Sequence, residues 1–232
     1  MIQQIDRVTF PVDGGSGEGY LALPDGPGPY RAVVVIQEWW GLNDHIKDVA
    51  RRFAAEGYVA LAPDLYHGAV TEEPNEARKL AMELQLDAAA RELSAAAAYL
   101  AARSDVAPNK VGVVGFCLGG SLALLLGAVS SDIGAVAAFY GGIDPGGEAG
   151  ARLRKIGAPV LAIYGSEDQG IPAERRMKLG QILTEIGVPH EIVVYEGAQH
   201  AFFNDTRPQA YHPEAAADAW RRTLKWFSSY LK

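Results

Sequence analysis

The stretch Val111-Gly-Val-Val-Gly115-Phe-Cys117-Leu-Gly-Gly120 decides how this chain folds. β-Branched residues lead into a cysteine flanked by glycines, and the apolar run 121–129 follows at once. This order predicts a buried strand, a sharp turn and a helix, which is the form of a nucleophile elbow with a thiol in place of the usual serine. Because the turn presses two backbone segments together, side chains at Gly115 and Gly119 would collide. Cys117 is then strained and stands at a helix N-terminus, where free amides and the dipole favour a thiolate.

The rest of the chain alternates between strand and helix patterns. Strand-forming runs lie at 32–36, 58–62, 135–140, 159–164 and 190–195. Helical patterns occupy 43–56, 173–186 and 213–231, and the alanine-rich stretch 75–103 predicts one long helix or two joined helices. Residues 8–24 predict a hairpin at an antiparallel edge. This alternation predicts a single α/β domain over residues 1–232, with a mostly parallel central sheet flanked by helices.

Composition excludes several classes of protein. The 232 residues are 49% hydrophobic, carry a net charge of -7 and contain no basic cluster, so we expect no binding of nucleic acid. Residues 1–11 lack the features of a secretory signal, and no apolar run is long enough to cross a bilayer. The single cysteine excludes an internal disulfide and a multi-cysteine metal cage. We therefore expect a cytoplasmic protein, a monomer or small homo-oligomer, with no metal or organic cofactor and no membrane partner.

Four polar residues each follow a different predicted strand: Glu38, Cys117, Asp168 and His200. Ligands of open α/β sheets bind beyond the carboxyl ends of the strands, so these side chains are expected to converge there. The chain order of nucleophile, acid and histidine is the order of α/β triads that carry such an elbow.

Chemical roles follow from these residue types. Cys117 would attack an electrophilic carbonyl, and His200 would accept the thiol proton and later deliver a proton to the leaving oxygen. Asp168 would fix the tautomer and orientation of the imidazole. The backbone N–H groups of Leu118 and Trp39 would bind the oxyanion.

Structural explanations compete with each of these roles. A lone cysteine is often a small buried hydrophobe, and Asp168 could simply cap the helix near residue 173. Asp144 is an alternative acid, and four histidines compete with His200: His45, His67, His190 and His212. Glu38 could be merely solvated. Four aromatic residues could pack at the rim or line an apolar substrate pocket: Trp39, Trp40, Phe202 and Phe203.

At these residues the chain resembles the dienelactone hydrolase family, cysteine-dependent members of the α/β-hydrolase fold that lack a separate lid domain. The resemblance rests on five stretches: 37–41, 57–58 with 63–66, 115–120, 165–168 and 200–202. It maps the family's nucleophile, acid and base onto Cys117, Asp168 and His200. It further implies that Glu38 pairs with the resting thiol and helps to deprotonate it when substrate binds.

The chain departs from the family where a substrate carboxylate would bind. Family members that act on lactone carboxylates have an arginine four residues after the catalytic histidine, where this chain has Asn204. A second arginine is expected near Pro74, where none occurs; Arg78 and Arg207 lie nearby and could substitute or be ordinary surface residues. The expected activity is therefore hydrolysis of a small ester or lactone. Attack of the same residues on an activated phosphotriester, or a non-catalytic binding role on this fold, are the alternatives.

Overall fold

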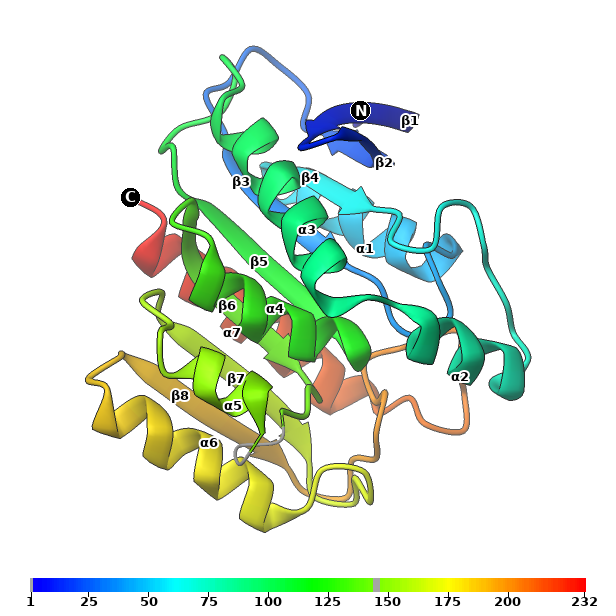
Figure 1. The fold of residues 1–232 in the computed structure, drawn as a ribbon, viewed down its shortest axis with the longest axis vertical. Helices are drawn as coiled ribbons and strands as arrows, with labels where there is room; N and C mark the ends of the chain where they lie inside the picture. The colour runs from blue at the N-terminus through cyan, green and yellow to red at the C-terminus, as the bar shows by residue number, and fades with distance from the viewer. Residues whose placement is uncertain (1, 144–146) are drawn as a thin grey trace.

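An eight-stranded sheet forms the centre of the protein in the computed structural model, which describes residues 2–143 and 147–232 (Figure 1). The strands are β1 (Gln3–Val12), β2 (Gly15–Leu23), β3 (Arg31–Ile36), β4 (Tyr58–Pro63), β5 (Val111–Phe116), β6 (Ile133–Phe139), β7 (Val160–Gly165) and β8 (His190–Tyr195). They lie in the order β1-β2-β4-β3-β5-β6-β7-β8. Only β1–β2 and β2–β4 pair antiparallel, and the other neighbours are parallel. The elbow strand β5 thus lies near the middle of the sheet, and the hairpin forms the edge as predicted.

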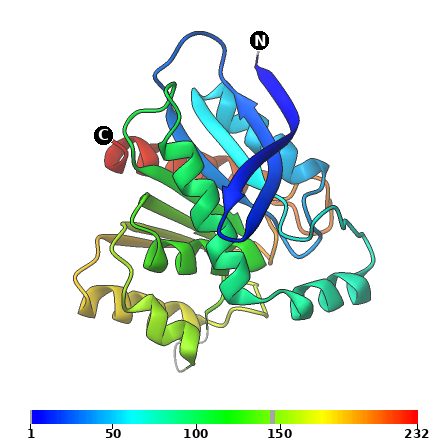
Figure 2. The ribbon, with the colours of Figure 1, turned by 45° about the horizontal axis from the view of Figure 1, so that its top comes forward.

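Helices cover both faces of the sheet. They are α1 (Asp44–Ala55), α2 (Pro74–Glu83), α3 (Leu86–Ala101), α4 (Leu118–Val129), α5 (Glu148–Leu153), α6 (Ala173–Glu185) and α7 (Pro213–Tyr230). Figures 1 and 2 show α3, α4, α5 and α6 on one face and α1 and α7 on the other, while α2 projects from the side. The fold class is therefore the α/β class that the sequence predicted.

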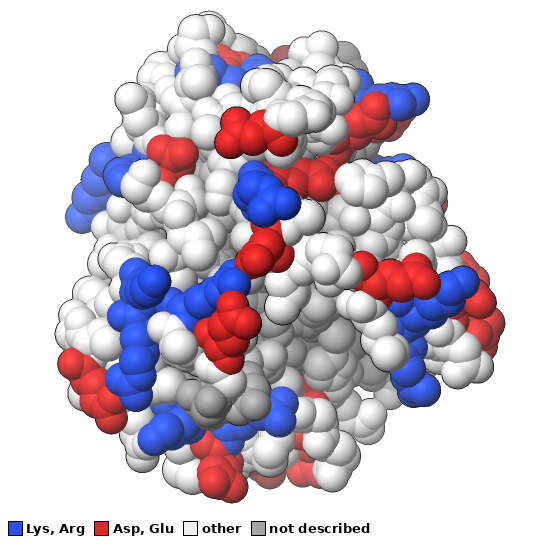
Figure 3. Space-filling view, viewed as in Figure 1, with Lys and Arg blue, Asp and Glu red and all other residues white. Residues whose placement is uncertain are grey.

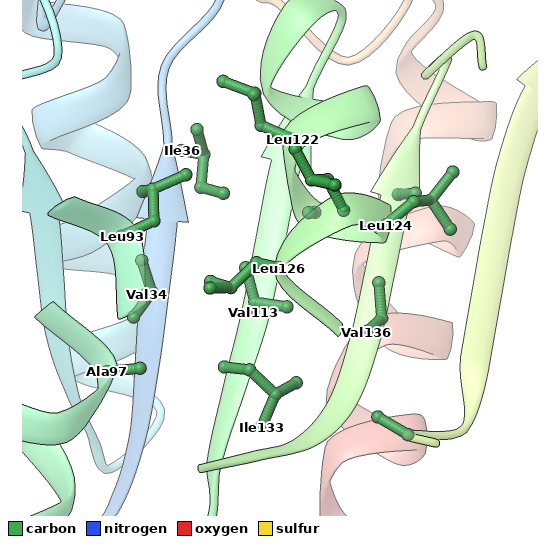
Figure 4. Close-up of a cluster of buried hydrophobic side chains, with 14 of the residues drawn as sticks. Val34, Ile36, Leu93, Ala97, Val113, Leu122, Leu124, Leu126, Ile133 and Val136 are labelled. Atoms are coloured by element: carbon green, nitrogen blue, oxygen red, sulfur yellow. The ribbon is translucent and has the colours of Figure 1, made fainter. Parts of the chain in front are cut away.

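The core has two layers because successive side chains of a strand point to opposite faces. On β3, Val34 and Ile36 pack beneath α3 and α4, whereas Val33 and Val35 pack beneath α1 and α7. Figure 4 shows part of the first layer, in which leucines of α4 lie over β3, β5 and β6. A central strand buried on both faces must be apolar throughout, which is why these runs do not alternate with polar residues.

The stretch 75–103 forms two helices rather than one. Leu84 leaves the helical conformation with ψ at 115°, and its side chain packs against the core between α2 and α3. The helix α5 was not predicted from the sequence; it begins after Gly147 and buries only Gly150 and Leu153. A short helix with so small an apolar face leaves little periodicity to detect.

The surface carries mixed charge. On the face drawn in Figure 3, acidic and basic side chains are interspersed. The ion pairs of the protein include Arg152–Glu148 and Arg154–Glu185. In the described part of the chain, no helix combines the length and apolar composition needed to cross a bilayer.

Candidate active site

Cys117 occupies a sharp turn between β5 and α4, with φ at 56° and ψ at -116°. This backbone conformation is costly for a residue with a side chain and persists only where the surroundings enforce it. The enforcement comes from contacts of the flanking glycines. A Cβ at Gly115 would lie 1.9 Å from the carbonyl oxygen of Gly119, and one at Gly119 would lie 2.4 Å from that of Gln37. The collision predicted from the sequence is therefore present on both sides of the cysteine.

Asp168 and His200 are joined by a hydrogen bond. The Nδ1 atom of His200 lies 2.7 Å from Oδ2 of Asp168, whose side chain is fully buried while that of His200 is 37% exposed. The other oxygen of Asp168 accepts hydrogen bonds from the backbone N–H groups of Gly170 and Ile171. Asp168 therefore binds the turn before α6 with one oxygen and the imidazole of His200 with the other. Its structural role near α6 and its contact with His200 are compatible.

The surroundings of His200 favour its protonated form. Burial would lower its pKa, but hydrogen bonding to Asp168 and Cys117 outweighs burial and raises the pKa to about 10. The imidazolium that results when the thiol proton passes to His200 is therefore stabilised by Asp168 and by Cys117. Asp168 and His200 lie 51 and 83 residues after Cys117 in the sequence. The fold nevertheless brings all three residues to one edge of the sheet.

Tyr140 is a site residue that the sequence reasoning missed. It follows β6 with φ at 39°, its ring lies 5.0 Å from that of His200, and it is fully buried. Burial, and then the charges of Glu38, Cys117 and Asp168, raise its pKa well above the usual value, so the phenol stays neutral. The sequence places Tyr140 at a strand end beside Gly141, the same kind of position that Cys117, Asp168 and His200 occupy.

A cavity of about 530 Å³ opens over these residues. Its wall includes Glu38, Trp39, Trp40, Cys117, Asp168, His200, Arg207 and Gln209. Most of the exposed lining is apolar, as is usual for small-molecule sites. The four residues that follow separate strands therefore converge on one pocket.

Glu38 lines this cavity and is almost completely buried. Its Oε2 atom accepts a hydrogen bond of 2.8 Å from the side chain of Asn204, and its Oε1 atom has no hydrogen-bond partner among the described residues. Burial raises the pKa of the carboxyl, against the opposing effects of Asn204, His200 and Arg207. The resemblance led us to expect a pair between Glu38 and the thiol; the described hydrogen bonds of Glu38 go to Asn204 instead.

The aromatic candidates divide into two groups. Trp39 and Trp40 lie in the cavity wall with their rings 4.9 Å apart. Phe202 and Phe203 are buried in the core instead, where Phe202 packs against Tyr140 and Tyr195. The structure does not place Phe202 among the residues that line the cavity, because an interior position beneath the loop is available to its ring.

The two arginine candidates also differ. Arg207 lies with its guanidinium 4.3 Å from the centre of the Trp40 ring and lines the cavity. Arg78 is exposed on the projecting helix α2 and is not among the lining residues. Stacking on an aromatic face holds a guanidinium in place while its N–H groups stay free, so Arg207 can meet an anionic or polar substrate group.

The competing histidines and acid lie elsewhere. His45 is buried beside Asp205, His67 is exposed, His190 begins β8, and the side chain of His212 caps α7. Asp144 lies outside the residues that the structure describes. Among those described, no group of three or more His, Cys, Asp or Glu side chains is arranged to hold a metal ion.

The oxyanion candidates are backbone groups beside the nucleophile. Leu118 is the first residue of α4, where an N–H group has no acceptor within its own helix. Trp39 follows β3 and lines the cavity with Cys117.

A parallel sheet with a nucleophile-elbow turn, followed by a buried acid and a histidine at successive strand ends, defines a protein of the α/β-hydrolase fold. Residues 18–231 match the dienelactone hydrolase family, and the chain belongs to that family. Two relatives carry the name "putative carboxymethylenebutenolidase". The protein from Synechocystis is 38% identical over 97% of this chain and 96% of its own, and that from Yersinia pestis is 37% identical over 97% and 88%.

Solved structures agree with this assignment. The crystal structure of a "putative dienelactone hydrolase" from Klebsiella pneumoniae superposes with a TM-score of 0.90 at 33% identity, over 99% of this chain and 100% of the other. A dienelactone hydrolase-like promiscuous phosphotriesterase from metagenomic libraries gives a TM-score of 0.89 at 25% identity, over 100% and 99%. The fold of this chain is thus shared with these solved structures.

Proposed function

We propose that this hydrolase cleaves a small ester or lactone through a thioester intermediate on Cys117. The observation that carries the proposal is the convergence of a strained, glycine-enforced cysteine with a hydrogen-bonded His200–Asp168 pair on one apolar cavity. A strained elbow costs stability, and such strain is typical of sites that use the residue it presents. The single cysteine and the catalytic thiol suit the reducing cytoplasm, where we place the protein, as a monomer or small homo-oligomer.

The chemistry follows in two balanced halves. Cys117 Sγ attacks the carbonyl carbon as His200 takes the thiol proton, and the N–H groups of Leu118 and Trp39 stabilise the oxyanion. The carbon–oxygen bond of the ester breaks, and His200 gives its proton to the leaving oxygen. Water then attacks the thioester while His200 accepts its proton. The carbon–sulfur bond breaks, the acid leaves, and the proton returns to sulfur. Asp168 stabilises the imidazolium in both halves.

Glu38 would assist the first proton transfer. Its side chain lines the cavity with Cys117, and its Oε1 atom is buried with no hydrogen-bond partner in the described part of the chain. The family resemblance assigns such a glutamate to thiol activation upon substrate binding. With Oε2 bound by Asn204, Oε1 would take the thiol proton and pass it to His200, which delivers it to the leaving oxygen.

A second electrophile is supported by one relative. The metagenomic enzyme of the same family is a promiscuous phosphotriesterase, and its fold matches this chain throughout. A thiolate, an imidazole and an oxyanion hole can serve an activated phosphotriester as well as an ester. A substrate panel of carboxylic esters and phosphotriesters with matched leaving groups separates the two activities.

The test uses an activated carboxylic ester such as a p-nitrophenyl ester. We expect a burst of product equal to the enzyme concentration, with parallel loss of titratable thiol, and Cys117→Ala should abolish both. Cys117→Ser controls for the elbow geometry because it retains a nucleophile of similar size. Full activity in Cys117→Ala would contradict the proposal.

A further inference from the structure

The loop that follows His200 is hydrogen-bonded to Glu38, which lies just after strand β3. Asn204 is almost completely buried, and its Nδ2 atom donates to Oε2 of Glu38 across 166 residues of sequence. The next residue, Asp205, pairs with Arg52 of α1, and Arg207 stacks on Trp40. A buried amide that bonds a buried carboxylate in this way has no solvent to compete with it, so the contact is well defined.

Thr206 fixes which way the amide of Asn204 points. The Oδ1 atom of Asn204 accepts from the backbone N–H of Thr206 at 3.1 Å and from its hydroxyl at 2.7 Å. A backbone N–H can only donate, so the amide oxygen must face Thr206. The NH₂ group of Asn204 then faces Glu38 and can only donate to it. The orientation of the amide is thus set by the chain itself.

The two oxygens of Glu38 are therefore not equivalent. Oε2 accepts from Asn204, whereas Oε1 is buried and has no described partner. A proton on Oε2 would face the hydrogens of the Asn204 amide, so a proton that Glu38 accepts belongs on Oε1. Since Glu38 lines the cavity together with Cys117, this is the oxygen free to exchange a proton there.

Neutral Asn204 also leaves the charge of Glu38 weakly compensated. The charged or titratable groups that face this carboxylate are His200 and Arg207, both from the same loop, and Tyr140 from the end of β6. Burial raises the pKa of Glu38 in spite of Asn204 and the two cations. The hydrogen bond from Asn204 acts in the opposite direction and favours the ionised form.

We propose that Asn204 and Thr206 are positioning residues that hold Glu38 by one oxygen and so reserve Oε1 for proton exchange in the catalytic cavity. The inference rests on the proposed role of Glu38 in thiol activation and extends it to two residues that do not touch the substrate. It assigns a function to the position where the substrate-binding arginine of the resembled family is missing.

A double-mutant cycle tests this proposal. Asn204→Ala should lower kcat/KM for a p-nitrophenyl ester about 10- to 100-fold, the range for losing a hydrogen bond to a charged group. In the Glu38→Gln background the same substitution should change the rate less than about twofold, because Asn204 acts only through Glu38. Equal losses in both backgrounds would overturn the inference.

The pH profile gives a second readout that a merely structural role would not move. Activity that needs ionised Glu38 is present above its pKa and falls as pH drops through it. Asn204→Asp keeps the size of the side chain, removes the donor and adds a negative charge, so the acid limb of kcat/KM should move to higher pH. Asn109→Asp, an exposed substitution of the same charge change, is the control and should leave the limb in place. An unshifted limb in Asn204→Asp would contradict the proposal.

Thr206 is tested by a matched pair. Thr206→Val removes the hydroxyl but keeps the backbone N–H, so we expect a loss of about two- to fivefold, and Thr206→Ser should restore the rate. Equal rates for the two variants would remove Thr206 from the proposal.

The thiol burst is measured in every variant. Its absence in the unmodified enzyme would refute the proposed function, whereas an intact burst with additive losses refutes only the positioning role.

Discussion

The two walls of the cavity are built in different ways. The inner wall, with Cys117 and Asp168, is held by strand ends and by backbone contacts, such as the approach of Gly115 to Gly119 and the N–H groups bound to Asp168. The outer wall depends on side chains, above all the stack of Arg207 on Trp40. Backbone contacts permit few substitutions, whereas a side-chain stack can be replaced. We therefore expect substitutions in the inner wall to impair the reaction itself, and substitutions in the outer wall to change which substrate is preferred.

The largest effect is expected at the elbow glycine. Gly115→Ala places a Cβ 1.9 Å from a carbonyl oxygen of the turn, so the turn must open. We expect destabilisation of more than about 3 kcal/mol, at the upper end of single substitutions. The control is Gly157→Ala, since a Cβ there meets no atom within 4 Å. Urea denaturation measures both, and equal stability of the two variants would show that the elbow is less constrained than its contacts indicate.

The next effect concerns the acid. Asp168→Asn can still accept the backbone N–H groups with its amide oxygen, but it presents a donor to His200 Nδ1 and favours the wrong tautomer. We expect kcat to fall about 10³- to 10⁴-fold, as in other triads. The pKa of His200 should fall from its raised value because its anionic partner is lost. NMR titration of the histidine follows this change, and a pKa that stays near 10 would mean that Asp168 does not set it.

A smaller effect is expected in the outer wall. Arg207→Met keeps part of the contact with Trp40 but removes the charge, and an exposed cation–π contact contributes about 0.5–1 kcal/mol. For a neutral ester, kcat/KM should change less than about fivefold, including the effect of losing a cation that faces Glu38. A substrate with a carboxylate should lose more affinity. If both substrates respond alike, Arg207 does not select for charge.

The smallest effect is expected at Arg78. It is exposed on α2, a helix in which only Ala77 is buried, and it does not line the cavity. Arg78→Ala should therefore leave kcat/KM within about twofold for neutral and anionic esters. A selective loss with the anionic ester would mean that α2 closes over the cavity during turnover.

The sequence was sufficient for the parts of the site that depend on chain order. Cys117, Asp168 and His200 follow the parallel strands β5, β7 and β8. Parallel strands bring their carboxyl ends to one edge, so the convergence of these residues could be predicted. Strand order does not predict which loops contact one another. The hydrogen bond between Asn204 and Glu38 requires the path of the loop after His200, which no periodicity encodes.

Residue type was equally uninformative for the aromatic groups. Trp40 and Phe202 both follow a strand and both looked like candidates for a pocket wall, yet Phe202 is in the core. Whether such a ring faces substrate or interior depends on the space beneath the loop, which is a property of packing and is invisible in one sequence.

The solitary cysteine has a practical consequence for any preparation of this enzyme. Because the chain contains one sulfhydryl and that group sits on the elbow, the proposed role of Cys117 makes a colorimetric thiol count also a count of intact reaction centres. Ageing by air oxidation would appear as a proportional loss of both signals, with no other sulfhydryl to obscure it. Under the proposed mechanism, the thiol count is thus an internal standard for specific activity.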